Sequence, residues 1–280
     1  MWLVSRHDLF VSVSNNRLYG DKCGYELPES LNTQQKRLEA IAKAKKVLEQ
    51  RARDQKKRDD DSDSDKPKSP PPRASTSRKK KAVPGPKDQL NFTDPDSRIM
   101  VNSDKAFVQA YNAQAAVDVE HQIIVAADLG NQAADGPYLI PLVQQAIEHI
   151  GHLDELSADA AYWSDRNLDF LAESSIEAFI PPERVRHSEW REARAPRGRI
   201  PHHATHRQLM SRKLKTKIGR RKYTLRQTTS EPTYGQIKEC RGLRQFFLRG
   251  LHKVQALWKM DCMVHNFLKI FGAGVRYAPQ

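Results

Sequence analysis

The most informative part of this chain is residues 223–250, YTLRQTTSEPTYGQIKECRGLRQFFLRG. This stretch places the carboxylate of Glu231 among many Lys and Arg residues. Three hydroxyl residues, 228–230, come directly before Glu231 and Pro232. A Ser/Thr cap followed by Pro is typical of a helix start, so a helix is predicted to begin here. Glu231 would then lie in the first turn, near the positive end of the helix dipole. On this pattern alone, the simplest interpretation is an amphipathic basic helix with a dipole-stabilising acid.

Residues that follow Glu231 extend this pattern. Glu231, Tyr234 and Lys238 are spaced so that they share one face of the predicted helix. Gly242 suggests an interruption, after which comes an apolar patch flanked by arginines: Leu243, Phe246, Phe247 and Leu248, with Arg241, Arg244 and Arg249.

Composition limits the class of protein. The chain has 280 residues, 38% of them hydrophobic, and a mean hydropathy of −0.74, which is low for a fully compact chain and predicts some disorder. It contains neither a long apolar window nor a signal peptide, so a cytoplasmic protein without a membrane segment is expected. The three cysteines lie far apart and match neither a disulfide framework nor a CxxC metal site.

Charge is concentrated in the C-terminal part. Residues 182–280 hold 23 Lys/Arg and 6 Asp/Glu, a net charge of +17; subtracting these from the totals of 47 and 34 leaves 24 and 28, or −4, for residues 1–181. Such a basic region releases counterions when it binds the phosphates of a nucleic acid. Ribosomal RNA or an anionic membrane surface would attract the same charge, so charge alone does not identify DNA.

Periodicity and composition divide the chain. Residues 1–30 are predicted to be irregular, 31–56 an amphipathic helix, and 57–90 a disordered, charged, Pro/Ser-rich linker. An ordered domain is predicted over 91–272, with a basic insert at 182–222 and a tail at 273–280.

Within 91–272 the pattern predicts mixed α/β structure. Residues 107–118 and 122–127 alternate as two strands of a hairpin, and apolar spacing predicts a helix over 136–149. A short buried strand is predicted to end at Asp159, with a helix following it. An acid at the carboxyl end of a buried strand is a typical position for a functional residue.

Five blocks in this order carry a resemblance: TDPDSRIM (93–100), FVQAYNAQAAVD (107–118), QIIVAADLGNQAAD (122–135), ADAAYWSDRNL (158–168) and SEPTYGQIKECRGLRQFFLRGLHKV (230–254). Together they resemble the DDE transposases of bacterial insertion sequences. The resemblance implies an RNase H-like fold, a mixed sheet flanked by helices, in which two Mg²⁺ ions are held by Asp, Asp and Glu. Two metals held by carboxylates supply what phosphodiester transfer needs, a deprotonated oxygen nucleophile and a stabilised leaving oxygen.

Site residues follow from the matching motifs. By resemblance, Asp159 and Glu231 are the catalytic metal ligands. Tyr223, Arg226, Glu231 and Lys238 resemble the family's Tyr-Arg-Glu-Lys signature, although the gap before Glu231 leaves Arg221 or Lys222 as alternatives to Arg226. Binding of DNA phosphates is predicted for Tyr223, Arg226, Lys238, Arg241 and Arg244.

The first Asp of the family's set has no clear counterpart. Upstream of the helix predicted over 31–56 the only acid of the opening segment MWLVSRHDLFVSVSNN is Asp8, in an unmatched context. The sequence therefore predicts a truncated domain that lacks the first strand and the first acid, and Asp118 is a less favoured substitute ligand.

Two functions from different classes remain open. One is a DNA transposase that cleaves and transfers strands with Mg²⁺; the other is a catalytically inactive remnant that binds DNA. Element ends and target DNA are the expected partners, with a homo-oligomer allowed and no membrane partner. A basic RNA- or ribosome-associated protein is a more distant alternative.

Overall fold

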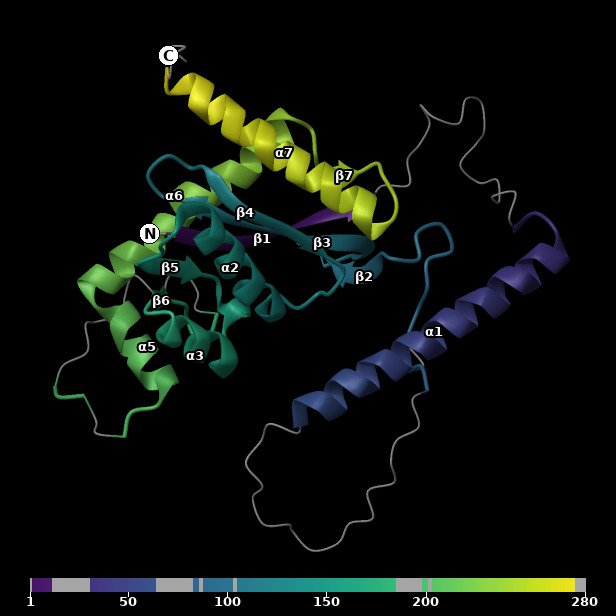
Figure 1. Cartoon of the computed structure of the whole chain (residues 1–280), viewed down its shortest axis with the longest axis horizontal. Coiled ribbons are helices and arrows are strands. Elements are labelled where there is room, and N and C mark those ends of the chain that lie inside the picture. Colours follow the sequence, from purple (N-terminus) through teal and green to yellow (C-terminus); the bar gives the residue numbers. More distant parts are fainter. Residues whose placement is uncertain are drawn as a thin grey trace, which may run out of the picture. The chain divides into compact units, whose positions relative to one another are not determined.

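The computed structural model describes residues 2–11, 31–63, 83–85, 88–102, 105–184, 198–200 and 203–274. The chain divides into two compact units, one made of Met1–Ser12 with Met100–Gln280 and the other of Val13–Ile99. Figure 1 shows the sheet of the larger unit with its helices. All the sequence-predicted site residues belong to this unit.

A seven-stranded mixed sheet forms the centre of the larger unit. Its strands are β1 (Trp2–Val11), β2 (Arg98–Val101), β3 (Phe107–Asp118), β4 (Ile124–Gly130), β5 (Glu155–Ala158), β6 (Glu177–Phe179) and β7 (Gln245–Phe246). The main order is β2-β3-β1-β5-β6, with β4 also paired to β3 and β7 to β1. β1 runs antiparallel to β3 and parallel to β5, and β5 runs parallel to β6. The predicted hairpin is confirmed as β3 and β4.

β1 corrects two expectations from the sequence. Residues 1–30 were predicted to be irregular and the sheet to lack its first strand, yet Trp2–Val11 forms a strand between β3 and β5. This segment pairs along nearly the whole of β3, from Trp2 opposite Asp118 to Phe10 opposite Ala110. Residues 12–30 lie outside the described part of the chain.

One face of the sheet is covered by α2 (Leu139–Ile150) and α3 (Asp165–Glu173). A short turn precedes each helix: η2 (Gly136–Tyr138) before α2, and η3 (Ala160–Tyr162) shortly before α3. α2 confirms the helix predicted over 136–149. Its buried stripe of Leu139, Leu142, Val143 and Ala146 packs against small residues of β3 and β4. Ser164 caps α3 by accepting a hydrogen bond from the Asn167 amide.

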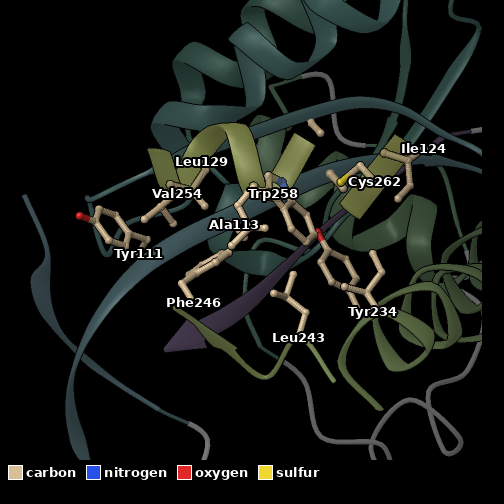
Figure 2. Close-up of a cluster of buried hydrophobic side chains, with 14 of the residues drawn as sticks. Tyr111, Ala113, Ile124, Leu129, Tyr234, Leu243, Phe246, Val254, Trp258 and Cys262 are labelled. Carbon is tan, nitrogen blue, oxygen red and sulfur yellow. The ribbon is translucent and has the colours of Figure 1, made fainter. Parts of the chain in front are cut away.

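The opposite face is covered by α6 (Lys217–Gly235), the π-turn η4 (Gln236–Cys240) and α7 (Leu251–Gly272). Figure 2 shows the core between them, where the Tyr234 and Trp258 rings stack with centroids 5.9 Å apart. Alanines of β3, such as Ala113 and Ala115, leave room for these rings. β3 is thus buried on both faces, which explains its apolar residues at successive positions.

α7 is fixed to the start of β4 by side-chain contacts. Asn266 both accepts a hydrogen bond from the Ile124 amide (2.8 Å) and donates one to the Ile124 carbonyl (2.7 Å). The C-terminal end of α7 is not part of this core, because Phe267, Leu268 and Phe271 are exposed.

The segment 182–222 is not a plain insert. Residues 185–197 and 201–202 are outside the described part, but α5 (His206–Lys215) and the first turns of α6 fall within it. Both helices are basic.

The smaller unit consists mainly of α1 (Gln34–Asp63). Its helix was predicted to end near residue 56 and the linker to begin at 57; instead the helix continues to Asp63, and residues 64–82 lie outside the described part. Arg51 donates a hydrogen bond to the Pro95 carbonyl, which joins α1 to the loop that follows.

Candidate functional site

Capping interactions mark both the start of α5 and the corner between α5 and α6. Thr205 and Gln208 form a reciprocal capping box at the start of α5. Thr216 then ends α5 and begins α6, since its amide bonds to the Lys213 carbonyl and its Oγ1 accepts from the Gly219 amide. A Cβ on Gly219 would lie 2.1 Å from the Lys213 carbonyl oxygen, so only glycine permits this close approach.

α6 continues through the predicted helix start. Glu231 is not in a first turn, and the prediction of a cap at residues 228–230 was wrong, because these residues lie inside α6 and the hydroxyls of Thr228 and Ser230 donate to carbonyls of the preceding turn. Ser230 donates to the Arg226 carbonyl at 2.9 Å. Pro232 lacks the amide that would bond the Thr228 carbonyl, and Gln122 Nε2 donates to that carbonyl instead at 3.3 Å.

Asp159 lies directly after β5, as predicted. One of its oxygens accepts from the Ala160 amide at 2.7 Å and caps η3, and the other lies 3.9 Å from Arg226 Nη1. The Arg226 side chain is only 13% exposed and lies 5.5 Å from the centre of the Tyr223 ring. Burial is the main cause that raises the pKa of the Tyr223 hydroxyl. The structure therefore brings Asp159, Arg226 and Tyr223 together.

Glu231 lies elsewhere on α6. Its side chain is exposed, and it follows Arg226 by five residues, which corresponds to about 140° around an α-helix. Tyr234, which the sequence placed on the same face as Glu231, is buried. Within the described residues, Glu231 has no recorded contact with Asp159.

The register of β1 describes the position beside Asp159. Val4 pairs with Ala158, so Ser5 is the β1 residue in line with Asp159. Ser5 pairs with Ala115 of β3. Asp8 pairs with Asn112, three positions further along β1. Hence the β1 position in line with Asp159 is not an acid.

Other predicted phosphate ligands contact the protein itself. Arg241 donates to the Asp261 carbonyl at 2.6 Å, and burial lowers the pKa of its guanidinium. Arg244 forms an exposed ion pair with Glu239. Lys238 lies in η4 and is partly buried. Their roles in binding DNA stay predictions.

Asp118 stabilises the turn between β3 and β4. Its Oδ2 accepts from the His121 amide at 2.8 Å and lies 3.3 Å from His121 Nδ1. This contact gives Asp118 a structural role at the hairpin, and its ligation of a metal stays a less favoured prediction.

The described side chains do not by themselves complete a two-metal centre. They include no group of three His, Cys, Asp or Glu residues placed to hold an ion. Asp159 faces Arg226, and Glu231 is on a different side of α6. Mg²⁺ requires oxygen ligands, commonly one or two carboxylates with substrate phosphates, so Asp159 and Glu231 supply only separate parts of such a set.

Cations on the sheet side of α5 and α6 are matched by acids. Lys213 lies 2.8 Å from Glu177, and Lys222 pairs with Glu155. Both ammonium groups also lie over the Phe179 ring, at 4.0 and 5.2 Å from its centre. The hydrogen bond from Lys213 is the main cause that lowers the pKa of Glu177. This cluster joins the two helices to the β5 and β6 edge.

An open groove of about 490 Å³ lies on the other side of this helix pair. This groove, called the α6 groove below, is lined by Lys215, Lys217, Arg220, Arg221, Thr224, Leu225 and Thr228. Sequence reasoning missed these cations as a set because it treated residues up to 222 as an insert. The Thr205-x-x-Gln208 capping box and the cap at Thr216 were the signals that could have revealed the helices.

Fold and site together define a class: a mixed α/β domain with an acid at the end of a central strand and a strongly basic helix across one face of the sheet. Residues 189–271 match the family model described as a transposase DDE domain. Over these residues, which include Glu231 and α6 but not Asp159, the chain is similar to a transposase DDE domain, and the recognition from sequence is confirmed there. A search of curated proteins found no match. Among the helices that the structure describes, none is long and apolar enough to cross a membrane.

Proposed function

We propose that this chain acts on DNA as a transposase protein. The observation that carries the proposal is the match of residues 189–271 to the transposase DDE domain, over the most basic part of the chain. Between His206 and Gly235 there are nine Lys/Arg residues and one acid, Glu231. A helix pair with this charge suits a phosphodiester backbone.

The sheet supports an RNase H-like fold as part of this proposal. β4, β3 and β1 form an antiparallel series, and β5 and β6 add parallel to β1 with helices between them. Asp159 at the end of β5 and Glu231 on α6 are the acids proposed for Mg²⁺-dependent cleavage and transfer of DNA strands. A divalent ion would supply Lewis-acid stabilisation of the oxygens that attack and leave.

A second candidate function is binding of DNA without cleavage. Two observations favour it: β1 carries Ser5 in line with Asp159, and the Asp159 carboxylate pairs with Arg226. A carboxylate paired with a guanidinium is already neutralised without an ion.

One pair of assays tests the proposal and separates the two candidates. The purified full chain is incubated with duplex DNA, and binding is measured by fluorescence anisotropy at several salt concentrations. Nicking and strand joining are then measured on DNA carrying the ends of the element, with Mg²⁺ or with a chelator. Binding that weakens with salt, together with Mg²⁺-dependent nicking, supports a transposase.

Substitutions test whether Asp159 and Glu231 take part in cleavage. Asp159→Asn keeps an oxygen that can accept from the Ala160 amide, so the cap and the fold should remain. If the chain cleaves, Asp159→Asn and Glu231→Gln each lower the rate by about 100-fold or more, whereas the turn variant Asp118→Asn does not. Binding without nicking in the unmodified chain selects the second candidate, and absence of both activities overturns the proposal.

A further inference from the structure

We infer that the α6 groove binds the phosphate backbone of duplex DNA, and that it does so apart from Arg226, which pairs with Asp159. This inference rests on the proposed function and adds to it the surface that holds the DNA. Its basis is the position of three exposed cations, Lys215, Lys217 and Arg221, in a groove whose described lining contains no acid.

Cations outside the α6 groove are already engaged by protein oxygens. Arg207 pairs with Glu183, Lys213 with Glu177 and Arg226 with Asp159. Arg212 donates to the Gly198 carbonyl at 2.8 Å. A ligand that bound these side chains would first have to break those contacts.

The α6 groove differs because its described lining contains exposed cations and no acid. Lys215, Lys217 and Arg221 are exposed there. They gather around the N-terminus of a 19-residue helix, whose dipole adds positive potential to that of the side chains. A concave surface with charge of one sign raises the local concentration of a polyanion.

The dimensions of the α6 groove suit a nucleic-acid strand rather than a single small anion. From Lys217 to Thr228 the helix rises by about 16 Å, at roughly 1.5 Å per residue. Along the duplex axis a DNA strand advances by about 3.4 Å per phosphate, so a duplex whose axis is parallel to α6 presents about five phosphates of each strand over this length. Arg forks and Lys ammonium groups bind such phosphates without reading the base sequence.

The α6 groove also leads toward Glu231. Thr228 and Glu231 are three residues apart and Thr224 and Glu231 seven, so all three share the outer side of α6. A strand held by the exposed cations would run past Glu231 at the C-terminal end of the same face. DNA bound here would approach the acid that the DDE domain match includes.

The test measures affinity for a fluorescent duplex of about 30 base pairs, a length that covers several helical turns, as a function of salt. The double variant Lys217→Gln/Arg221→Gln removes two groove cations. We expect a weaker complex and a decrease of about 2 in the slope of log affinity against log salt. The matched control Arg207→Gln/Arg212→Gln removes two cations of α5 that protein oxygens engage, and should leave the slope within about 0.5 of the unmodified chain.

An unchanged slope and affinity in the groove variant, with binding by the unmodified chain intact, overturns the α6 groove but not the proposed function. Equal losses in both double variants also overturn it, because they would show only an effect of net charge. Absence of DNA binding by the unmodified chain overturns the proposed function itself. Tighter binding of an RNA duplex in the same assay would overturn the assignment to DNA, and thermal unfolding of each variant verifies that it is folded.

Discussion

The two sides of α6 contain similar residues but use them differently. Toward the sheet, Lys222 and Arg226 face Glu155 and Asp159, and Tyr234 is buried in the core. Toward solvent, Lys217 and Arg221 line the α6 groove, where no acid is among the described lining residues. Basic residues on the first side therefore hold the helix to the sheet, whereas those on the second are available to an external anion. Total charge, which is all that composition reports, does not distinguish them.

The largest expected effect concerns packing on the sheet side. Tyr234→Ala would remove a ring that is 1% exposed and stacked on Trp258, and should lower the free energy of unfolding by about 3–5 kcal/mol. Ile218→Ala, on the solvent side and 69% exposed, should change it by less than about 0.5 kcal/mol. Urea denaturation measures both. Similar losses in the two variants would mean that the two sides of α6 are not different in packing.

A smaller loss of stability is expected from a substitution at the corner between α5 and α6. Gly219→Ala places a Cβ against the Lys213 carbonyl, so the α5–α6 corner must shift, at a cost of about 1–3 kcal/mol. The shift should also weaken DNA binding, because Lys215 and Lys217 lie on opposite sides of this corner. Gly235→Ala is the control, since nothing lies within 4 Å of a Cβ there. An unchanged melting temperature in Gly219→Ala would show that the helices do not need the close approach.

The smallest effect is electrostatic and depends on pH. The pKa of Glu177 is lowered in the folded chain, mainly by the Lys213 hydrogen bond, from an ordinary value of 4.5. Stability from this pair is therefore present above that ordinary value and is lost as the pH falls through the lower, folded value. Because the Glu177 side chain is 49% exposed, its contribution is about 0.5 kcal/mol.

The variant Glu177→Gln measures this contribution. At about pH 7 it should unfold at slightly lower urea than the unmodified chain, and the difference should vanish well below pH 4.5. A difference that grew as the pH fell would contradict the sign of the shift.

The sequence predicted the parts of the fold that depend on local pattern. The β3–β4 hairpin, α2 and the position of Asp159 all follow from alternation or helical spacing, and the structure confirms them. β1 was missed because a strand of ten residues with charged members resembles a loop until its partners β3 and β5 are known. Its stability comes from pairing with residues more than a hundred positions away, which no local pattern contains.

The site was predictable to a lesser extent. Motif spacing identified Asp159 and Arg226, and the structure places them in contact. Glu231 was assigned to a helix start because residues 228–230 look like a cap, whereas helix capping actually occurs at Thr216. The predicted helix start was therefore more than a helical turn too late in the sequence. The α6 groove was not predicted for this reason, because the side of the helix on which each cation lies depends on where the helix begins and how it packs.

The most direct test of the central claim, that the solvent side of α6 binds DNA, is protection of a thiol placed there. In a chain with Cys23→Ser and Cys240→Ser, Thr224→Cys puts a thiol in the α6 groove, and Glu148→Cys puts one on exposed α2 as a control. The rate of alkylation is measured with and without saturating duplex DNA. If the solvent side of α6 binds DNA, DNA should slow alkylation at position 224 by about 10-fold or more and leave the rate at position 148 unchanged. Equal rates at position 224 with and without DNA, under conditions where the duplex is bound, would contradict it.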